Sequence, residues 1–217
     1  MNIKAFIFDL DGVITDTAVY HFQAWQRMAH RLGIEFTHED NEELKGVSRR
    51  DSLERILEKS DREFSEEEKL RLMDEKNEDY KQLIGSITQH NMFDGVRECF
   101  DELRKRGIKT ALASASRNAR TIVASLGIES DFDFLADAAK VANSKPAPDI
   151  FIAAMEGLGL QANECIGIED AAAGVESIKS ANMFAVGIGD AEILSQADIV
   201  FSDMKSLDID RVLEKAT

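Results

Sequence analysis

Cysteine, proline and tryptophan are scarce in this 217-residue chain, which contains two, two and one of them. The two cysteines, Cys99 and Cys165, show no CxxC or histidine-linked spacing, which argues against a zinc site or a disulfide framework. Both are therefore predicted to be packing residues, as cysteines in a reducing compartment often are.

Long apolar runs are also absent. No segment approaches the roughly 18 apolar residues that a membrane span needs. Acidic residues directly follow the short apolar run near the N-terminus, which is not typical of a signal peptide. The sequence therefore predicts a cytoplasmic protein with no membrane partner.

Positive charge is in short supply, with 26 Lys and Arg against 41 Asp and Glu and a formal net charge of −15. Such a balance repels nucleic acid and anionic membrane surfaces, so small molecules are the expected partners. The 44% of hydrophobic residues is ordinary for a globular protein. The length allows one core with a small accessory domain.

Short apolar runs typical of buried strands alternate with helical stretches. The expected strands are 4–9, 108–116, 132–137, 165–170, 183–189 and 198–201, and the expected helices are 95–106, 117–126, 148–158, 171–181 and 206–215. This alternation predicts an α/β fold, with a parallel sheet covered by helices on both faces. Ligands of such sheets bind outside the carboxyl ends of the strands.

Residues 15–90 interrupt the alternation, because they show helical periodicity and no strand run. One apolar face, at i, i+3 and i+4 spacing, consists of Phe22, Trp25, Met28, Ala29 and Leu32. A second helix follows, and 65–84 is predicted to be a third, long and heavily charged one. We expect a core domain of residues 1–14 and 92–217 and an inserted helical cap domain of residues 15–91.

Four polar motifs fall at the ends of expected strands. They are DLDGV (9–13), ASAS (113–116), SKPAPD (144–149) and GIEDAAAG (167–174). Because the carboxyl ends of parallel strands meet at one edge of a sheet, these motifs are expected to converge in space. Together they supply the carboxylates of Asp9, Asp11, Glu169 and Asp170, the cation of Lys145 and the hydroxyl of Ser114.

These groups predict a magnesium-dependent phosphoryl-transfer enzyme. Carboxylate oxygens suit Mg²⁺, whereas without a metal the clustered acids would repel one another and become protonated. With Mg²⁺ and Lys145 present, Asp9 is expected to stay ionised and to attack phosphorus as a nucleophile. Asp11, two residues on, is expected to act as general acid and base towards the oxygen that leaves or attacks.

With these motifs the sequence resembles the haloacid dehalogenase superfamily. DLDGV is similar to the first motif of that superfamily, Ser114 to the second, Lys145 to the third and Glu169–Asp170 to the fourth. The resemblance implies a Rossmann-like core and an aspartyl-phosphate intermediate. It also implies Mg²⁺ held by Asp9, the backbone carbonyl of Asp11 and Asp170, with Glu169 in the same ligand cluster. The helical insert is similar to the C1 cap class.

Longer stretches are similar to the sugar phosphomutases of that superfamily, over essentially the whole chain. They are 9–25, 44–53, 112–116 and 144–151. The implied function is an isomerase that interconverts β-D-glucose 1-phosphate and D-glucose 6-phosphate through β-D-glucose 1,6-bisphosphate. The alternatives are a sugar-phosphate phosphatase, which needs no second phosphate site, and a silent sugar-phosphate binder, which the presence of both Asp9 and Asp11 disfavours. A monomer is expected.

The resemblance also implies a set of substrate-binding residues. They are Thr17, His21, Trp25, Lys45, Gly46, Val47, Arg49, Ser52, Lys76, Ala115, Ser116 and Asn118. Arg49 would hold the phosphate that is not being transferred, because its planar fork suits bidentate phosphate binding. Thr17 and His21 would position Asp11 when the cap closes. Without the resemblance, Arg49 and Lys45 also fit solvated helix-end charges, and His21 and Trp25 fit structural residues.

Overall fold

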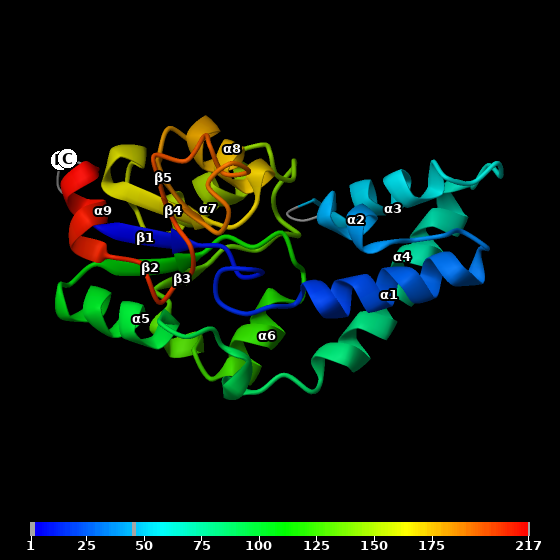
Figure 1. The fold of residues 1–217 in the computed structure, drawn as a ribbon, viewed down its shortest axis with the longest axis horizontal. Helices are drawn as coiled ribbons and strands as arrows, with labels where there is room; N and C mark the ends of the chain where they lie inside the picture. Colours follow the sequence, from blue (N-terminus) through cyan, green and yellow to red (C-terminus); the bar gives the residue numbers. More distant parts are fainter. Residues whose placement is uncertain (1–2, 45–46, 217) are drawn as a thin grey trace.

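Among the residues that the structure describes, six parallel strands form one sheet in the order β3-β2-β1-β4-β5-β6 (Figure 1). They are β1 (Ala5–Phe8), β2 (Lys109–Leu112), β3 (Phe134–Leu135), β4 (Cys165–Glu169), β5 (Phe184–Ile188) and β6 (Ile199–Phe201). The structure is a computed structural model and describes residues 3–44 and 47–216. All six strands lie within the ranges expected from the sequence, and the predicted α/β fold is confirmed.

Helices precede and follow these strands. The α-helices are α1 (Ala18–Arg31), α2 (His38–Glu42), α3 (Arg49–Leu57), α4 (Glu66–Ile84), α5 (Val96–Lys105), α6 (Ala119–Leu126), α7 (Asp149–Gly157), α8 (Ala172–Ser180) and α9 (Ile209–Lys215). The described residues also form short 3-10 helices, which are η1 (Gln89–Asn91), η2 (Glu129–Asp131) and η3 (Ala162–Glu164). The sequence did not predict α2, which is only five residues long and carries no apolar periodicity.

Strand β1 lies inside the sheet, between β2 and β4, and is buried on both faces. All four of its residues are buried. Phe6 and Phe8 belong to one apolar cluster, and Ala5 and Ile7 belong to a second. Because successive side chains point to opposite faces, β1 has an apolar cluster on each side, as a strand buried between two layers of helices requires. The two buried cysteines are free and contribute to these clusters.

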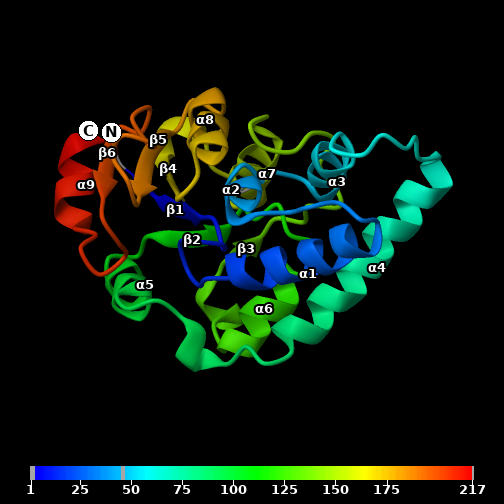
Figure 2. The same ribbon diagram turned by 45° about the vertical axis from the view of Figure 1, so that its right-hand side comes forward.

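Helices α1 to α4, here called the helical insert, come between β1 and α5 in the chain and lie to one side of the sheet (Figures 1 and 2). They bury their own apolar cluster, in which Phe22, Trp25 and Met28 of α1 meet Leu53 of α3 and Leu72 of α4. The insert therefore has a core distinct from the two that flank the sheet. Helix α1 packs along α4, as both views show.

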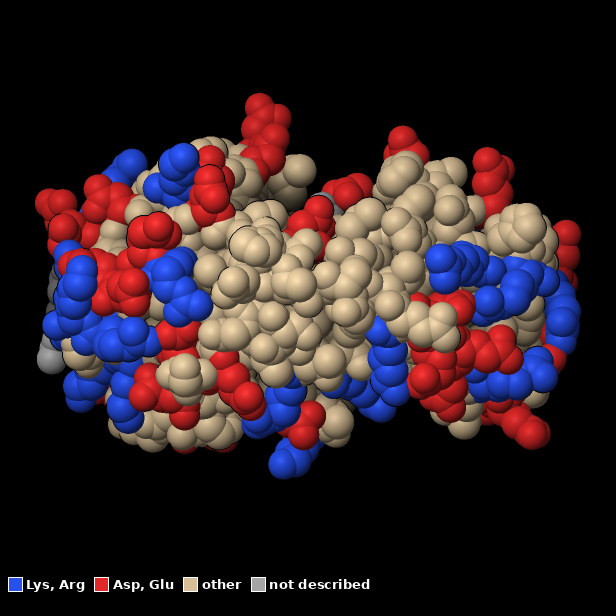
Figure 3. Space-filling model, turned by 90° about the horizontal axis from the view of Figure 1, so that it is seen from below, with Lys and Arg blue, Asp and Glu red and all other residues tan. Residues whose placement is uncertain are grey.

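Charged side chains gather towards the two ends of the face seen in Figure 3, and uncharged residues occupy its middle. Surface cations are commonly paired, as Arg97 and Arg104 are with the buried carboxylate of Asp131 and Arg106 is with Asp210. Much of the scarce positive charge is thus neutralised locally. Within residues 3–44 and 47–216, no helix combines the length and apolar character that crossing a membrane would require.

Candidate active site

Asp9 lies directly after β1, at the carboxyl edge of the sheet. Lys145 Nζ donates a hydrogen bond to Asp9 Oδ1 at 2.7 Å, and the backbone N–H of Asp11 donates to Asp9 Oδ2 at 3.0 Å. The side chain is buried, with 6% of the residue exposed. Its carboxylate is therefore held in one orientation, which favours attack along a fixed line.

Asp11 lies two residues further on, where the chain turns towards the helical insert. The hydroxyl of Thr17, itself fully buried, donates a hydrogen bond to Asp11 Oδ1. Burial, and after it the negative charge of Asp9, raise the pKa of Asp11 to about 7. A carboxyl group with this pKa can both donate and accept a proton near neutral pH, which is what a general acid and base must do. The contact from Thr17 supports the positioning role expected of that residue.

Lys145 joins two of the site's carboxylates. Its Nζ lies 2.7 Å from Asp9 Oδ1 and 2.5 Å from Glu169 Oε1, and only 2% of the residue is exposed. Burial lowers its pKa, but the two carboxylates raise it more, so the pKa lies above its usual value and the amine is charged. Glu169 Oε2 accepts hydrogen bonds from the backbone N–H groups of Asp170 and Ala171, at 2.9 and 3.0 Å. The peptide bond between Lys145 and Pro146 is cis.

Asp9, Glu169 and Asp170 form an acidic cluster that could hold a metal ion. One ligand atom from each lies within 4.8 Å of the others. The packing leaves room for these groups, because a Cβ on Gly12 would come within 1.9 Å of Asp170 Oδ2 and a Cβ on Gly174 within 1.9 Å of the Glu169 carboxyl group. The chain thus fits a hard cation, which prefers such oxygen ligands.

The loop after β2 reaches the same edge of the sheet. Ser114 is buried, and its hydroxyl oxygen accepts a hydrogen bond from the backbone N–H of Ser116 at 3.1 Å. Ser116 Oγ in turn accepts one from the backbone N–H of Asn118 at 3.2 Å. These short-range bonds shape the loop into a tight turn that begins helix α6.

A cavity of about 1110 Å³ lies between this edge and the helical insert. The expected site residues that line it are Asp9, Asp11, Thr17, His21, Trp25, Val47, Arg49, Ser52, Lys76, Ala115, Ser116, Asn118, Lys145 and Asp170. Ser114 and Glu169 do not line it and lie buried behind it. Lys45 and Gly46, also expected at the site, lie outside the described residues.

Arg49 links the insert to the loop after β2. Its Nη2 donates a hydrogen bond to Asn77 Oδ1 at 2.8 Å, and the same oxygen accepts one from Asn118 Nδ2 at 2.9 Å. Burial, and after it the charge of Arg117, lower the pKa of Arg49. In the described part of the chain, neither arginine forms an ion pair with a carboxylate. Two guanidinium groups beside one cavity, without an ion-pair partner among the described residues, could together hold an anion.

Sequence reasoning missed Arg117 and Asn77. Arg117 could have been found, because it lies between Ser116 and Asn118, which were both expected at the site. Asn77 gave no signal, because it is one polar residue in a charged helix. Only the packing of α3 against α4 brings it to Arg49.

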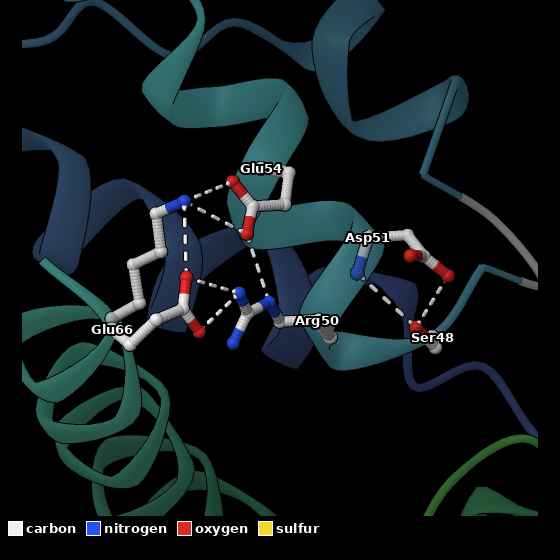
Figure 4. A network of polar contacts seen from close by, with 6 residues as sticks. Ser48, Arg50, Asp51, Glu54 and Glu66 are labelled. Carbon is white, nitrogen blue, oxygen red and sulfur yellow. Dashed lines mark hydrogen bonds and ion pairs between the residues drawn. The ribbon is translucent and has the colours of Figure 1, made fainter. Parts of the chain in front are cut away.

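Helix α3, which carries Arg49 in its first turn, is fixed by polar contacts (Figure 4). Arg50 forms ion pairs with Glu54 and with Glu66 of α4, and Lys69 of α4 pairs with Glu54 at 2.8 Å. At the start of the helix, Asp51 Oδ2 accepts hydrogen bonds from Ser48 Oγ at 2.6 Å and from Ser144 Oγ at 3.0 Å. Since Ser144 precedes Lys145, this last bond joins the insert to the catalytic edge of the sheet.

Lys76 of α4 is buried next to the aromatic rings of Trp25 and Tyr80. Its Nζ lies 3.0 Å from His21 Nδ1, and it lies 4.5 and 4.7 Å from the ring centres of Trp25 and Tyr80. Burial, and after it the charge of Arg49, lower the pKa of Lys76 well below its usual value. Burial and the charge of Lys76 likewise lower the pKa of His21, so this histidine is neutral. Trp25, which is buried in the insert, also lines the cavity.

Comparisons with known proteins agree with this geometry. Residues 3–182 match the family of haloacid dehalogenase-like hydrolases. The chain is 32% identical, over 83% of its length and 82% of the relative, to the phosphorylated carbohydrates phosphatase of Thermotoga maritima. The chain therefore belongs to the haloacid dehalogenase-like hydrolase family.

Within that family the chain is a homologue of β-phosphoglucomutase. It is 43% identical to the β-phosphoglucomutase of Bacillus subtilis (strain 168), over 98% of this chain and 95% of that one. The crystal structure of β-phosphoglucomutase from Clostridium difficile superposes with a TM-score of 0.95 at 48% identity, and the match covers 99% of this chain and 97% of that one. The resemblance seen in the sequence is thus confirmed along nearly the whole chain.

Proposed function

We propose that the chain is an isomerase that interconverts β-D-glucose 1-phosphate and D-glucose 6-phosphate. The observation that carries this proposal is the anion site of Arg49 and Arg117, which shares one cavity with Asp9. A mutase passes through a bisphosphate and must hold one phosphate while it transfers the other, whereas a phosphatase needs only one phosphate site. The identity to two β-phosphoglucomutases supports the same assignment.

In the first half-reaction, Asp9 carries the phosphoryl group. Asp11 takes the proton from the 6-hydroxyl of β-glucose 1-phosphate, and the hydroxyl oxygen displaces Asp9 from phosphorus. Lys145 neutralises the Asp9 carboxylate that is released. The product is β-glucose 1,6-bisphosphate, and Arg49 with Arg117 holds its other phosphate.

In the second half-reaction, the bisphosphate has turned around in the cavity. The Asp9 carboxylate attacks the phosphorus of the phosphate on the carbon-1 oxygen, and Asp11 returns its proton to that departing oxygen. Glucose 6-phosphate leaves and Asp9 is phosphorylated again. Asp11 serves both halves, and its pKa of about 7 suits a group that must be base and then acid.

We propose Mg²⁺ as the cation of the acidic cluster, held by Asp9, Asp170 and the backbone carbonyl of Asp11, with Glu169 in the cluster behind them. When bound, it supplies positive charge that stabilises the oxygens of the transferring phosphoryl group. The remaining site residues bind and orient. Thr17 positions Asp11, and the loop of Ala115, Ser116 and Asn118 contacts phosphate.

We further propose that residues 15–91 act as a cap on the core of residues 1–14 and 92–217. Asn118 Nδ2 donates a hydrogen bond to Asn77 Oδ1 and Ser144 Oγ donates one to Asp51 Oδ2, and these two bonds join the two parts across the cavity. Closure would keep water from the phosphorylated Asp9 and bring Arg49 to the substrate. A monomeric state and a cytoplasmic location remain predictions.

The test uses purified protein with Mg²⁺, β-glucose 1-phosphate and a trace of β-glucose 1,6-bisphosphate. Glucose 6-phosphate and free phosphate are followed together. Formation of glucose 6-phosphate with little free phosphate is expected of the mutase. Release of phosphate without glucose 6-phosphate would instead support the alternative, a sugar-phosphate phosphatase, which the 32% identity to a phosphatase of phosphorylated carbohydrates favours as second candidate.

A further inference from the structure

A phenol from the helical insert reaches the cavity without a hydrogen bond. Tyr80 of α4 lines the cavity, and only 1% of the residue is exposed. Across residues 3–44 and 47–216, its hydroxyl is the single buried side-chain oxygen or nitrogen with no hydrogen-bond partner. Buried polar groups are nearly always paired, so this exception calls for an explanation.

Packing explains the ring of Tyr80 but not its hydroxyl. The ring belongs to the large apolar cluster beside the sheet, together with Ala24 and Ile84. It lies 4.2 Å from the His21 ring, centre to centre, and it faces the amine of Lys76 at 4.7 Å. A phenylalanine ring would make all these contacts, so the hydroxyl adds nothing to them.

The surroundings of the hydroxyl locate it inside the proposed reaction site. Burial, and after it the negative charge of Asp11, raise the pKa of Tyr80 above its usual value, and the neighbouring hydroxyls of Thr17 and Ser116 and the charge of Arg49 lower it by less. The phenol therefore keeps its proton at neutral pH and can donate it. Both Asp11, the proposed general acid and base, and Arg49 of the anion site are close enough to influence it, and all three residues line the cavity.

We propose that the Tyr80 hydroxyl donates a hydrogen bond to an oxygen of the sugar when a sugar phosphate is bound. The inference rests on the proposed function and adds a substrate-binding residue to it. The sugar of a bisphosphate must lie between the transferring phosphate at Asp9 and the other phosphate at Arg49, and this donor lines the same cavity near Asp11 and Arg49. A donor that is satisfied only by substrate also selects for ligands with an oxygen at that place.

The test compares Tyr80→Phe with Tyr20→Phe, a variant of the other tyrosine among the two in the chain. In the absence of substrate, Tyr80→Phe is expected to melt at or up to about 4 °C above the wild type, because it removes an unpaired buried hydroxyl. Its kcat/KM for β-glucose 1-phosphate is expected to fall by about 5- to 10-fold, the loss of one hydrogen bond. Phosphorylation of Asp9 by acetyl phosphate, which has no sugar, should keep the wild-type rate. Tyr20→Phe should match the wild type in turnover.

Two results would overturn the proposal. One is an unchanged kcat/KM in Tyr80→Phe. The other is a fall in melting temperature together with an equal loss of phosphorylation by acetyl phosphate, since that would make Tyr80 a structural residue. Failure of the mutase assignment would look different, because the wild type itself would then form no glucose 6-phosphate. In that case a loss of sugar-phosphate hydrolysis in Tyr80→Phe, with acetyl phosphate turnover kept, would still support the contact.

Discussion

Replacement of Gly12 by alanine tests how the turn after β1 builds the acidic cluster. Gly12 has a φ of +81°, and a Cβ there would lie 1.9 Å from Asp170 Oδ2 and 2.3 Å from Asp170 Cγ. Ordinary van der Waals contact begins at 3.4 Å, so the carboxylate of Asp170 would have to move by about 1.5 Å. The side chain that is displaced is one of the proposed metal ligands.

Two costs add in this variant and can be separated. A positive φ costs alanine roughly 1–2 kcal/mol, which lowers the melting temperature of a protein of this size by about 2–8 °C. The displacement of Asp170 adds a functional cost, because disturbing groups at a metal site typically weakens metal affinity by about 10- to 100-fold. Gly127→Ala is the matched control, since Gly127 has a φ of +70° and nothing lies within 4 Å of its added Cβ.

Calorimetric unfolding, with and without Mg²⁺, measures both costs, and a titration with Mg²⁺ gives the affinity. Both variants are expected to lose stability without the metal. Only Gly12→Ala is expected to lose most of the stabilisation by Mg²⁺ and with it the turnover. Wild-type affinity for Mg²⁺ in Gly12→Ala, or an equal loss of affinity in Gly127→Ala, would refute the reasoning.

Three further changes test the catalytic groups. Asp9→Asn should leave no detectable phosphorylated enzyme in a radiolabel assay, because an amide is a poor nucleophile, and retained turnover would contradict the role of Asp9. Arg49→Ala should lower mutase kcat/KM by about 10- to 100-fold, the strength of a hydrogen bond to a charged group, while it spares hydrolysis of acetyl phosphate; equal losses would make Arg49 structural. His21→Asn should flatten the pH dependence of stability. Burial and Lys76 lower the pKa of His21 in the folded state, so the unfolded chain binds more protons below pH 6.5. The free energy of unfolding of the wild type should therefore decrease as the pH is lowered below 6.5, by up to about 1.4 kcal/mol per pH unit. Equal slopes for the two proteins in urea titrations at pH 5 to 7 would show that His21 is not responsible.

The amino-acid sequence by itself determined the architecture and the reacting groups. Strands such as β1 and β4 are short apolar runs bounded by acids and glycine, and this local pattern suffices to place them. Because the ends of parallel strands share one edge, the order of the motifs alone predicts that Asp9, Lys145 and Asp170 meet there. The helical insert was equally visible, since helical periodicity replaces strand runs in residues 15–90.

Only the tertiary structure decided how those groups are tuned and what faces them. The pKa of Asp11 depends on burial and on Asp9, and neither can be read from spacing. The bridge from Arg49 through Asn77 to Asn118 and the unpaired hydroxyl of Tyr80 arise where the insert meets the sheet. Such contacts join residues far apart in the chain, and they depend on how the insert packs against the sheet. Strands and turns depend instead on neighbours a few residues away, which is why the sequence reveals them.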